Sequence, residues 1–282
     1  MKQIEVTIPL SRRRLWRIWR KKYTCSLAEN WAELTETERL FCLQKLLAIA
    51  DATVAKSCVL PRLLKMPTEV FFDLDEDDQS ALIDQLDWLK IEGHSTPLIK
   101  EFTHNGTGYT LPKAKFQDGT AIEFALADQF LETFTQSGDT QDLLKLVGAL
   151  AAPTEKGKRL PLLNREDAEH RADVLRGLPF ETAMAVLLCG VGVKEYVSKS
   201  YPFLFDDADD EDDVNVRAAV AHFPNFGWWG AYLGIAETGV FGNYAQVLQT
   251  NFHRICMFLT EKRKENKRQR AAFKSNNPTD GV

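Results

Sequence analysis

The sequence lacks the motifs that mark the common catalytic and redox sites. It has no CxxC pair, no GxSxG nucleophile turn, and no phosphate loop of the GxxxxGK[ST] or GxGxxG type. Zinc ribbons, thioredoxin-like redox sites, serine hydrolase sites and nucleotide-binding loops are therefore not indicated. We expect a protein that has no enzymatic activity and needs no cofactor.

Long apolar runs are also missing. The two longest, 182–193 and 226–240, are shorter than the roughly 18 residues that a membrane-spanning helix needs. The first ten residues lack the continuous apolar segment of a signal peptide. We therefore expect a cytoplasmic protein with no membrane partner.

Metal-ligand patterns are incomplete. Asp167 and His170 have the spacing of half a di-iron site, but no second matching pair occurs. Residues 73–78 begin like a calcium-binding loop, but the sixth position is aspartate where the loop requires glycine. The sequence therefore predicts no metal site.

The five cysteines are widely spaced and form no evident pairs. Cys42, Cys189 and Cys256 lie in apolar runs, where a reduced cysteine behaves as a small buried hydrophobic residue. We expect these three thiols to be reduced and buried.

Charge is unevenly distributed along the 282 residues, whose net charge is −5. Residues 1–22 carry eight basic and one acidic side chain, and residues 261–274 carry seven basic and two acidic, so the rest of the chain has a net charge of −17. The like-charge block at 206–213, DDADDEDD, is expected to be a mobile loop. This distribution favours charge-steered association with a partner.

Hydrophobic periodicity predicts a mainly α-helical fold. Capping boxes at Thr35 and Thr120 mark two helix starts, and apolar residues at spacings of three and four follow each. β-structure is predicted only as a short strand at 3–9 and as a small hairpin near 98–112. The hairpin rests on an Asn-Gly pair at 105–106, which tolerates the positive φ of a tight turn.

The helical and polar segments suggest two regions. We expect an N-terminal helical region with the hairpin, residues 1–118, and a C-terminal helical domain, residues 119–282. Residues 153–162 are predicted to be a polar linker. An apolar stripe from Phe241 to Leu259 predicts one long terminal helix over 241–273, whose basic end projects beyond the core.

The basic segment 11–23 interleaves arginines and lysines with Trp16 and Trp19. Its cations could contact phosphates while the tryptophans stack on bases. The same pattern would suit an acidic protein surface or an anionic membrane. Its apolar side chains could also pack on the protein's own core while the arginines stay in water, and the sequence leaves these alternatives open.

Several short motifs follow one another in a definite order over residues 3–200. They are Ile8-Pro9, Trp31-x-x-Leu34-Thr35, Leu86-x-Trp88-Leu89, Ile99-Lys-Glu-Phe102, Asn105-Gly106 with Tyr109, Phe116-x-x-Gly119-Thr120 and Glu123-Phe-x-x-Ala127-Asp128. Their order resembles a family of poorly characterised proteins from phages and prophages of Bacteroidetes. The basic segment 11–23 is not part of that pattern.

Proteins of this family are found among virion structural and tail genes, so the resemblance implies a tail assembly chaperone or a minor tail protein. It implies no catalytic residue. The partner would be another phage structural protein, such as the tape measure or tail tube protein. The protein would act in the cytoplasm of the bacterial host or as part of the virion.

Two hypotheses follow for the function. The first is a non-enzymatic phage morphogenesis protein, a tail assembly chaperone or adaptor that binds another tail protein. The alternative is a nucleic-acid-associated protein that uses the basic segments 11–22 and 261–274. The candidate partner-binding residues are Arg12, Arg13, Arg14, Trp16, Arg17, Trp19, Lys262, Arg263, Lys264, Lys267, Arg268 and Arg270.

Overall fold

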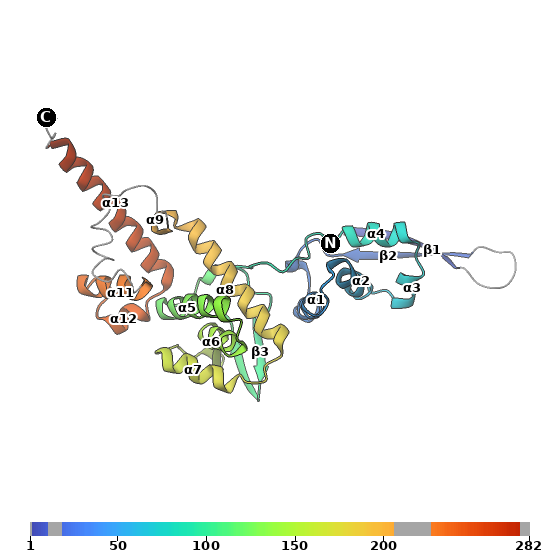
Figure 1. Ribbon diagram of the computed structural model, residues 1–282, viewed down its shortest axis with the longest axis horizontal. Helices are drawn as coiled ribbons and strands as arrows, with labels where there is room; N and C mark the ends of the chain where they lie inside the picture. The colour runs from blue at the N-terminus through green and yellow to red at the C-terminus, as the bar shows by residue number, and fades with distance from the viewer. Residues whose placement is uncertain (1, 11–18, 206–226, 277–282) are drawn as a thin grey trace. The chain divides into compact units, whose positions relative to one another are not determined.

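The computed structural model describes residues 2–10, 19–205 and 227–276 (Figure 1). Helices dominate this part of the chain, and its strands form one two-stranded and one four-stranded antiparallel sheet. The predicted mainly α-helical class is confirmed. The acidic block 206–213, predicted as a mobile loop, lies outside the described residues.

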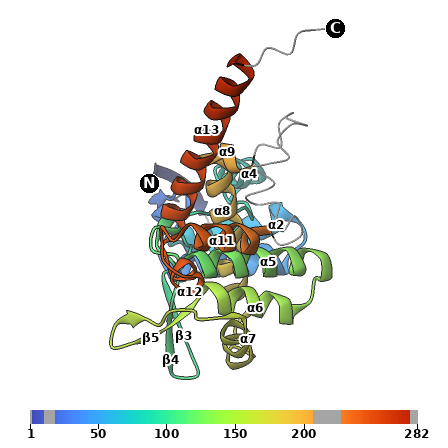
Figure 2. The ribbon, with the colours of Figure 1, turned by 90° about the vertical axis from the view of Figure 1, so that its left-hand side faces the viewer.

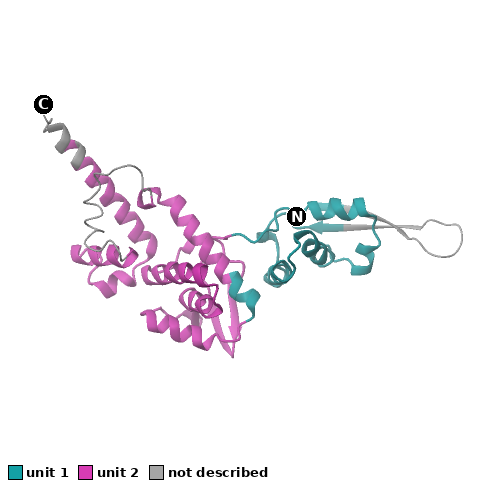
Figure 3. Ribbon diagram, in the orientation of Figure 1, with its two compact units in different colours: residues 1–92, 179–185 teal, residues 93–178, 186–282 magenta. Residues whose placement is uncertain are grey.

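The chain divides into two compact units (Figure 3). Unit 1 contains residues 1–92 and 179–185, and unit 2 contains residues 93–178 and 186–282. The division after Glu92 falls earlier than the expected boundary at 118. The reason is that the hairpin near 98–112 pairs with a later strand of unit 2.

A β-ribbon opens unit 1. Strand β1, Lys2–Leu10, pairs antiparallel with β2, Trp19–Leu27, so that Lys2 lies opposite Leu27 and Leu10 opposite Trp19. Strand β1 agrees with the strand predicted at 3–9. Strand β2 begins within the basic segment 11–23 and was not predicted from the sequence. On β2, Cys25 and Leu27 are buried and Ser26 between them is half-buried, which is the alternation of a strand with one covered face.

The helices of unit 1 begin where the sequence places their caps. The Thr35 hydroxyl accepts from the Glu38 amide, and the Glu38 carboxylate accepts from the Thr35 amide at 2.9 Å, which confirms the predicted capping box. The core includes Leu43, Leu60 and Leu86, all fully buried. The elements are η1 Trp31–Glu33, α1 Glu36–Ala48, α2 Ala52–Leu63, α3 Thr68–Phe72 and α4 Glu76–Asp84.

Unit 2 contains the four-stranded sheet, in the order β3-β4-β5-β6. The predicted hairpin is confirmed, because Asn105 and Gly106 adopt φ values of 48° and 78° between β3 and β4. The predicted linker at 153–162 is wrong. Lys156 and Gly157 make a second positive-φ turn there, and β5 adds to the sheet beside β4. The strands are β3 Glu101–His104, β4 Thr107–Thr110, β5 Ala152–Glu155 and β6 Lys158–Arg159.

Helices α5, α6 and α7 pack side by side in chain order within unit 2 (Figure 2). Their N-caps are Thr120, Asp139 and Asn164, each accepting a backbone amide of its first turn. The helices between β4 and residue 205 are η2 Ala114–Phe116, α5 Ala121–Ser137, α6 Thr140–Leu150, α7 Arg165–Val174, α8 Phe180–Ser200 and α9 Pro202–Phe205. The helices from residue 227 onward are α11 Gly227–Thr238, α12 Tyr244–Leu248 and α13 Phe252–Asn276.

The prediction of one continuous helix over 241–273 is wrong, because the chain breaks between α12 and α13. At the break, the Thr250 carbonyl accepts from the Ala121 amide at 2.9 Å, and the Phe252 amide donates to the Gly119 carbonyl at 3.0 Å. The Asn251 side chain also donates to the Gln117 carbonyl at 2.8 Å. These bonds fix the break against the start of α5 and direct Phe252 into the core.

Cysteine burial gives a direct test of this packing. Cys58 is exposed on α2, whereas the other four cysteines are buried, as predicted for Cys42, Cys189 and Cys256. Burial raises the pKa of the Cys42 and Cys189 thiols to about 12, so neither forms much reactive thiolate near neutral pH. We expect one thiol to react rapidly with a disulfide reagent at pH 8, and all five to react in denaturant.

The control for that measurement is Cys58→Ser, which should abolish the rapid phase and leave the slow reaction unchanged. Two or more rapidly reacting thiols in the native protein would contradict the burial of the remaining cysteines.

Candidate binding groove

The structure separates the two groups of predicted binding residues. Arg12, Arg13, Arg14, Trp16 and Arg17 lie outside the described residues, and Trp19 begins β2 of unit 1. The second group follows Leu259 on helix α13 of unit 2; it contains Lys262, Arg263, Lys264, Lys267, Arg268 and Arg270. The two groups therefore belong to different units.

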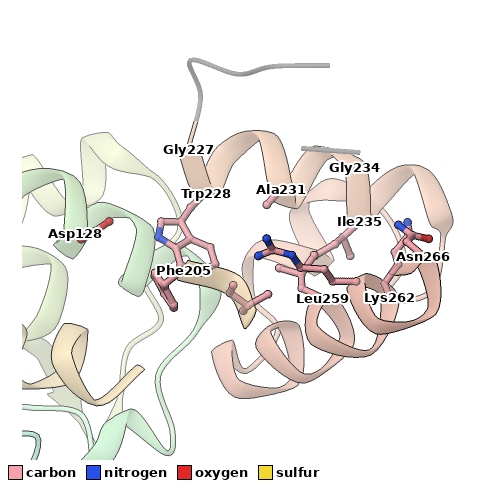
Figure 4. Close-up of a pocket in the computed structure, with 12 residues that line it drawn as sticks. Asp128, Phe205, Gly227, Trp228, Ala231, Gly234, Ile235, Leu259, Lys262 and Asn266 are labelled. Carbon is pink, nitrogen blue, oxygen red and sulfur yellow. The ribbon is translucent and has the colours of Figure 1, made fainter. Parts of the chain in front are cut away.

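Three helices of unit 2, α9, α11 and α13, form the walls of a groove of about 330 Å³ (Figure 4). Asp128 of α5 lies at one end of the groove, and Lys262 and Asn266 of α13 lie at the other end. The groove is lined by Asp128, Leu204, Phe205, Gly227, Trp228, Ala231, Gly234, Ile235, Leu259, Lys262, Arg263 and Asn266.

The apolar floor comes mainly from α11. Trp228, Ala231 and Ile235 are spaced three and four residues apart, so one face of the helix presents them together. The hydroxyl of Tyr232 on the same helix donates to the Ala121 carbonyl at 2.9 Å and holds α11 against α5. This floor was not predicted from the sequence, although the helical spacing of its apolar residues within the run 226–240 indicates it.

Cations stand at the α13 end of the groove. Arg263 donates to the Phe203 carbonyl and so anchors α9 to α13. The Lys262 ammonium lies 5.9 Å from the centre of the Phe258 ring, and no carboxylate within the described residues forms an ion pair with it. Asp128 at the other end pairs with Lys194 at 2.6 Å. The groove therefore offers the uncompensated positive charge of Lys262 beside an apolar floor.

The projecting basic end of α13 begins later than the sequence suggested. Lys262, Arg263, Lys264 and Asn266 are half-buried, because α9 packs against this turn. The Lys264 ammonium lies 5.8 Å from the centre of the Phe203 ring and pairs with Glu261 at 2.8 Å. Lys267 and Arg268 are exposed, whereas the first cations after Leu259 form part of the groove wall.

A second, largely buried charged cluster joins residues of α5, β6 and α7, and it was not predicted from the sequence. The Glu123 carboxylate accepts from Arg159 at 3.1 Å, while Arg171 donates to the Pro161 carbonyl at 2.7 Å and to Asp167 at 3.2 Å. Burial raises the pKa of Glu123 and lowers the pKa of Arg171. These side chains cap helix α5 and bind backbone carbonyls, so we assign the cluster a structural role.

Asp167, which belongs to one of the partial metal-ligand patterns, contacts only protein groups among the described residues. Asp167 pairs with Arg171 and accepts from the Leu163 amide, so its carboxylate is occupied by protein groups. Across the described ranges, no three His, Cys, Asp or Glu residues gather as metal ligands would. His253 likewise has both ring nitrogens within hydrogen-bond distance of protein oxygens, those of Tyr201 and Lys115.

Comparisons with known proteins add no family. No protein-family model matches this sequence, and neither the curated proteins nor the solved structures gave a significant match. Among the helices of residues 2–10, 19–205 and 227–276, none has the length and apolar character needed to cross a membrane.

Proposed function

We propose that this chain is a non-enzymatic binding protein that holds a segment of another protein in the α9–α11–α13 groove. The observation that carries the proposal is the apolar floor of Trp228, Ala231 and Ile235 beside the ammonium of Lys262, which pairs with no carboxylate of the described residues. Apolar surface in a concave site gives affinity when it is covered, and charge at its edge selects and orients the partner.

For the particular role we propose phage tail morphogenesis, with the chain as a tail assembly chaperone or adaptor. The support is the resemblance over residues 3–200, and the partner it implies is another tail protein, such as the tape measure or tail tube protein. Of the groove residues only Asp128 lies within that range. Packing and charge thus support the partner-binding surface, and the resemblance supports the biological setting.

Co-expression and pull-down with tail proteins encoded beside this chain's gene tests the proposal. Truncation after Asn266 removes the exposed basic end and leaves the groove lining intact, so we expect most capture to remain. Truncation after Thr260 removes Lys262 and Arg263 from the wall, so we expect capture to be lost. Equal capture by both truncated chains, with melting temperatures near that of the full chain, would contradict a role for the groove.

A second candidate function is nucleic-acid binding, favoured by the β1–β2 ribbon. Arg20, Lys21 and Lys22 of the basic segment lie on β2, and a two-stranded ribbon fits the major groove of DNA. A gel-shift assay with duplex DNA at about 50 and 200 mM salt tests it, because phosphate contacts lose affinity steeply over that range. Tight, salt-sensitive DNA binding without capture of any tail protein would favour this function over the first.

A further inference from the structure

We propose that the occupant of the groove is an amphipathic, acidic α-helix of the partner protein. The inference rests on the proposed function, which supplies a protein as the bound molecule, and it names the kind of segment that the groove takes.

The walls of the groove suit a helix. The α11 wall carries Gly227, Ala231 and Gly234 beside the larger side chains, and small residues allow a second backbone to approach closely. The floor residues repeat at helical spacing along α11. A helix laid in such a groove inserts side chains from positions i, i+3, i+4 and i+7. These would cover the half-buried Trp228 and the exposed Phe205.

The charges select an acidic helix. Lys262 and Arg263 both line the groove. The acidic residue of the lining, Asp128, is already paired with Lys194. A carboxylate on the bound helix would therefore meet Lys262 without competition from a described carboxylate of this chain. A polyphosphate would find cations at one end only and would leave the apolar floor uncovered.

A designed peptide tests this directly with the full-length protein. The probe is a fluorescein-labelled helical peptide of about 18 residues, with leucines on one face and glutamates on the other; a matched control peptide carries lysines in place of the glutamates. Fluorescence anisotropy should show saturable binding of the glutamate peptide and at least about tenfold weaker binding of the lysine peptide, because like charges meet in the second case.

Three variants locate the binding. Lys262→Glu should weaken binding of the glutamate peptide about tenfold or more, whereas Lys267→Glu, with the same charge change on an exposed position of the same helix, should change it less than about threefold. Gly234→Leu fills the groove while favouring the helical state of α11, so it should block binding and leave the melting temperature unchanged or higher.

Several results would overturn the inference. Equal losses for Lys262→Glu and Lys267→Glu would indicate diffuse charge attraction, and full binding by Gly234→Leu would place the peptide elsewhere. Competition by equimolar duplex DNA would assign the surface to nucleic acid. Tenfold tighter binding after deletion of 206–213 would identify the chain's own acidic segment as the occupant.

The failure of this inference can be told apart from failure of the proposed function. If a tail protein is captured equally by the wild type and by Lys262→Glu, the tail-assembly role stands and the groove assignment fails. If the peptide binds with the expected variant pattern but no tail protein is captured, the groove assignment stands and the phage role fails.

Discussion

Replacing Arg159 by methionine is expected to lower the free energy of unfolding by about 3–5 kcal/mol at neutral pH. The side chain of Glu123 is 4% exposed, and its carboxylate accepts from Arg159 at 3.1 Å. Methionine keeps the approximate length of the side chain but removes the charge, so Glu123 would remain buried without its cation. Chemical denaturation followed by circular dichroism measures the change.

The pH dependence of that loss distinguishes an unpaired charge from a packing defect. Burial holds the pKa of Glu123 above its usual range, although the positive charge of Arg159 lowers it. Removal of the Arg159 charge would therefore raise the pKa of Glu123 further. The folded protein then binds this proton more readily than the unfolded chain, so stability falls as pH rises through the interval between the two pKa values. The loss in Arg159→Met should therefore be smaller at pH 5 than at pH 8.

Two companion variants complete the test. Glu123→Gln in the Arg159→Met background removes the buried charge and should recover part of the lost stability. Arg176→Met breaks the exposed ion pair with Asp173 and should cost no more than about 1 kcal/mol. A pH-independent loss in Arg159→Met, or no recovery in the double variant, would mean that the ion pair is not what stabilises this region.

The second large effect is expected at Phe252. Its ring is fully buried, stacks on Phe124 with centroids 3.8 Å apart, and meets Phe116 and Trp228 edge-on. Phe252→Ala leaves a cavity among these rings and should lower the free energy of unfolding by about 3–5 kcal/mol. Because Trp228 is also in the groove lining, peptide binding to this variant should weaken as well.

Met257→Ala on the same helix is the matched control. Met257 is 53% exposed, so its truncation removes apolar atoms without opening a cavity and should change stability by less than about 1 kcal/mol. Losses of similar size for the two variants would contradict the view that α13 is held to unit 2 through Phe252.

The elements that the sequence predicts correctly are those with local causes. Thr35 and Thr120 satisfy amides only three residues away, and the Asn-Gly turn needs nothing beyond its own backbone. The second strand of the ribbon and the β5–β6 hairpin depend on partners elsewhere in the chain, so periodicity in one segment does not reveal them. The break before Phe252 was missed because the apolar stripe runs through it unchanged.

The candidate site was predictable only in part. Lys262 and Arg263 stand out from charge alone, whereas the groove needs α9 and α11 to pack on α13. Charge along the sequence cannot show that Arg263 donates to the Phe203 carbonyl, or that Lys262 has no ion pair with any residue in the part of the chain that the structure describes. The grouping by sequence also joined the two basic segments, which the fold assigns to separate units.

The hydrogen bonds between residues 119–121 and 250–252 also bear on the order in which the chain folds during synthesis. The start of α5 leaves the ribosome long before Thr250 and Phe252 are made. Until then, the Ala121 amide and the Gly119 carbonyl lack their hydrogen-bond partners. Contacts of such sequence separation form late and slow the last folding step. Nascent chains that end before Asn243 should therefore stay sensitive to protease around Gln117–Ala121, and chains released at full length should become resistant there.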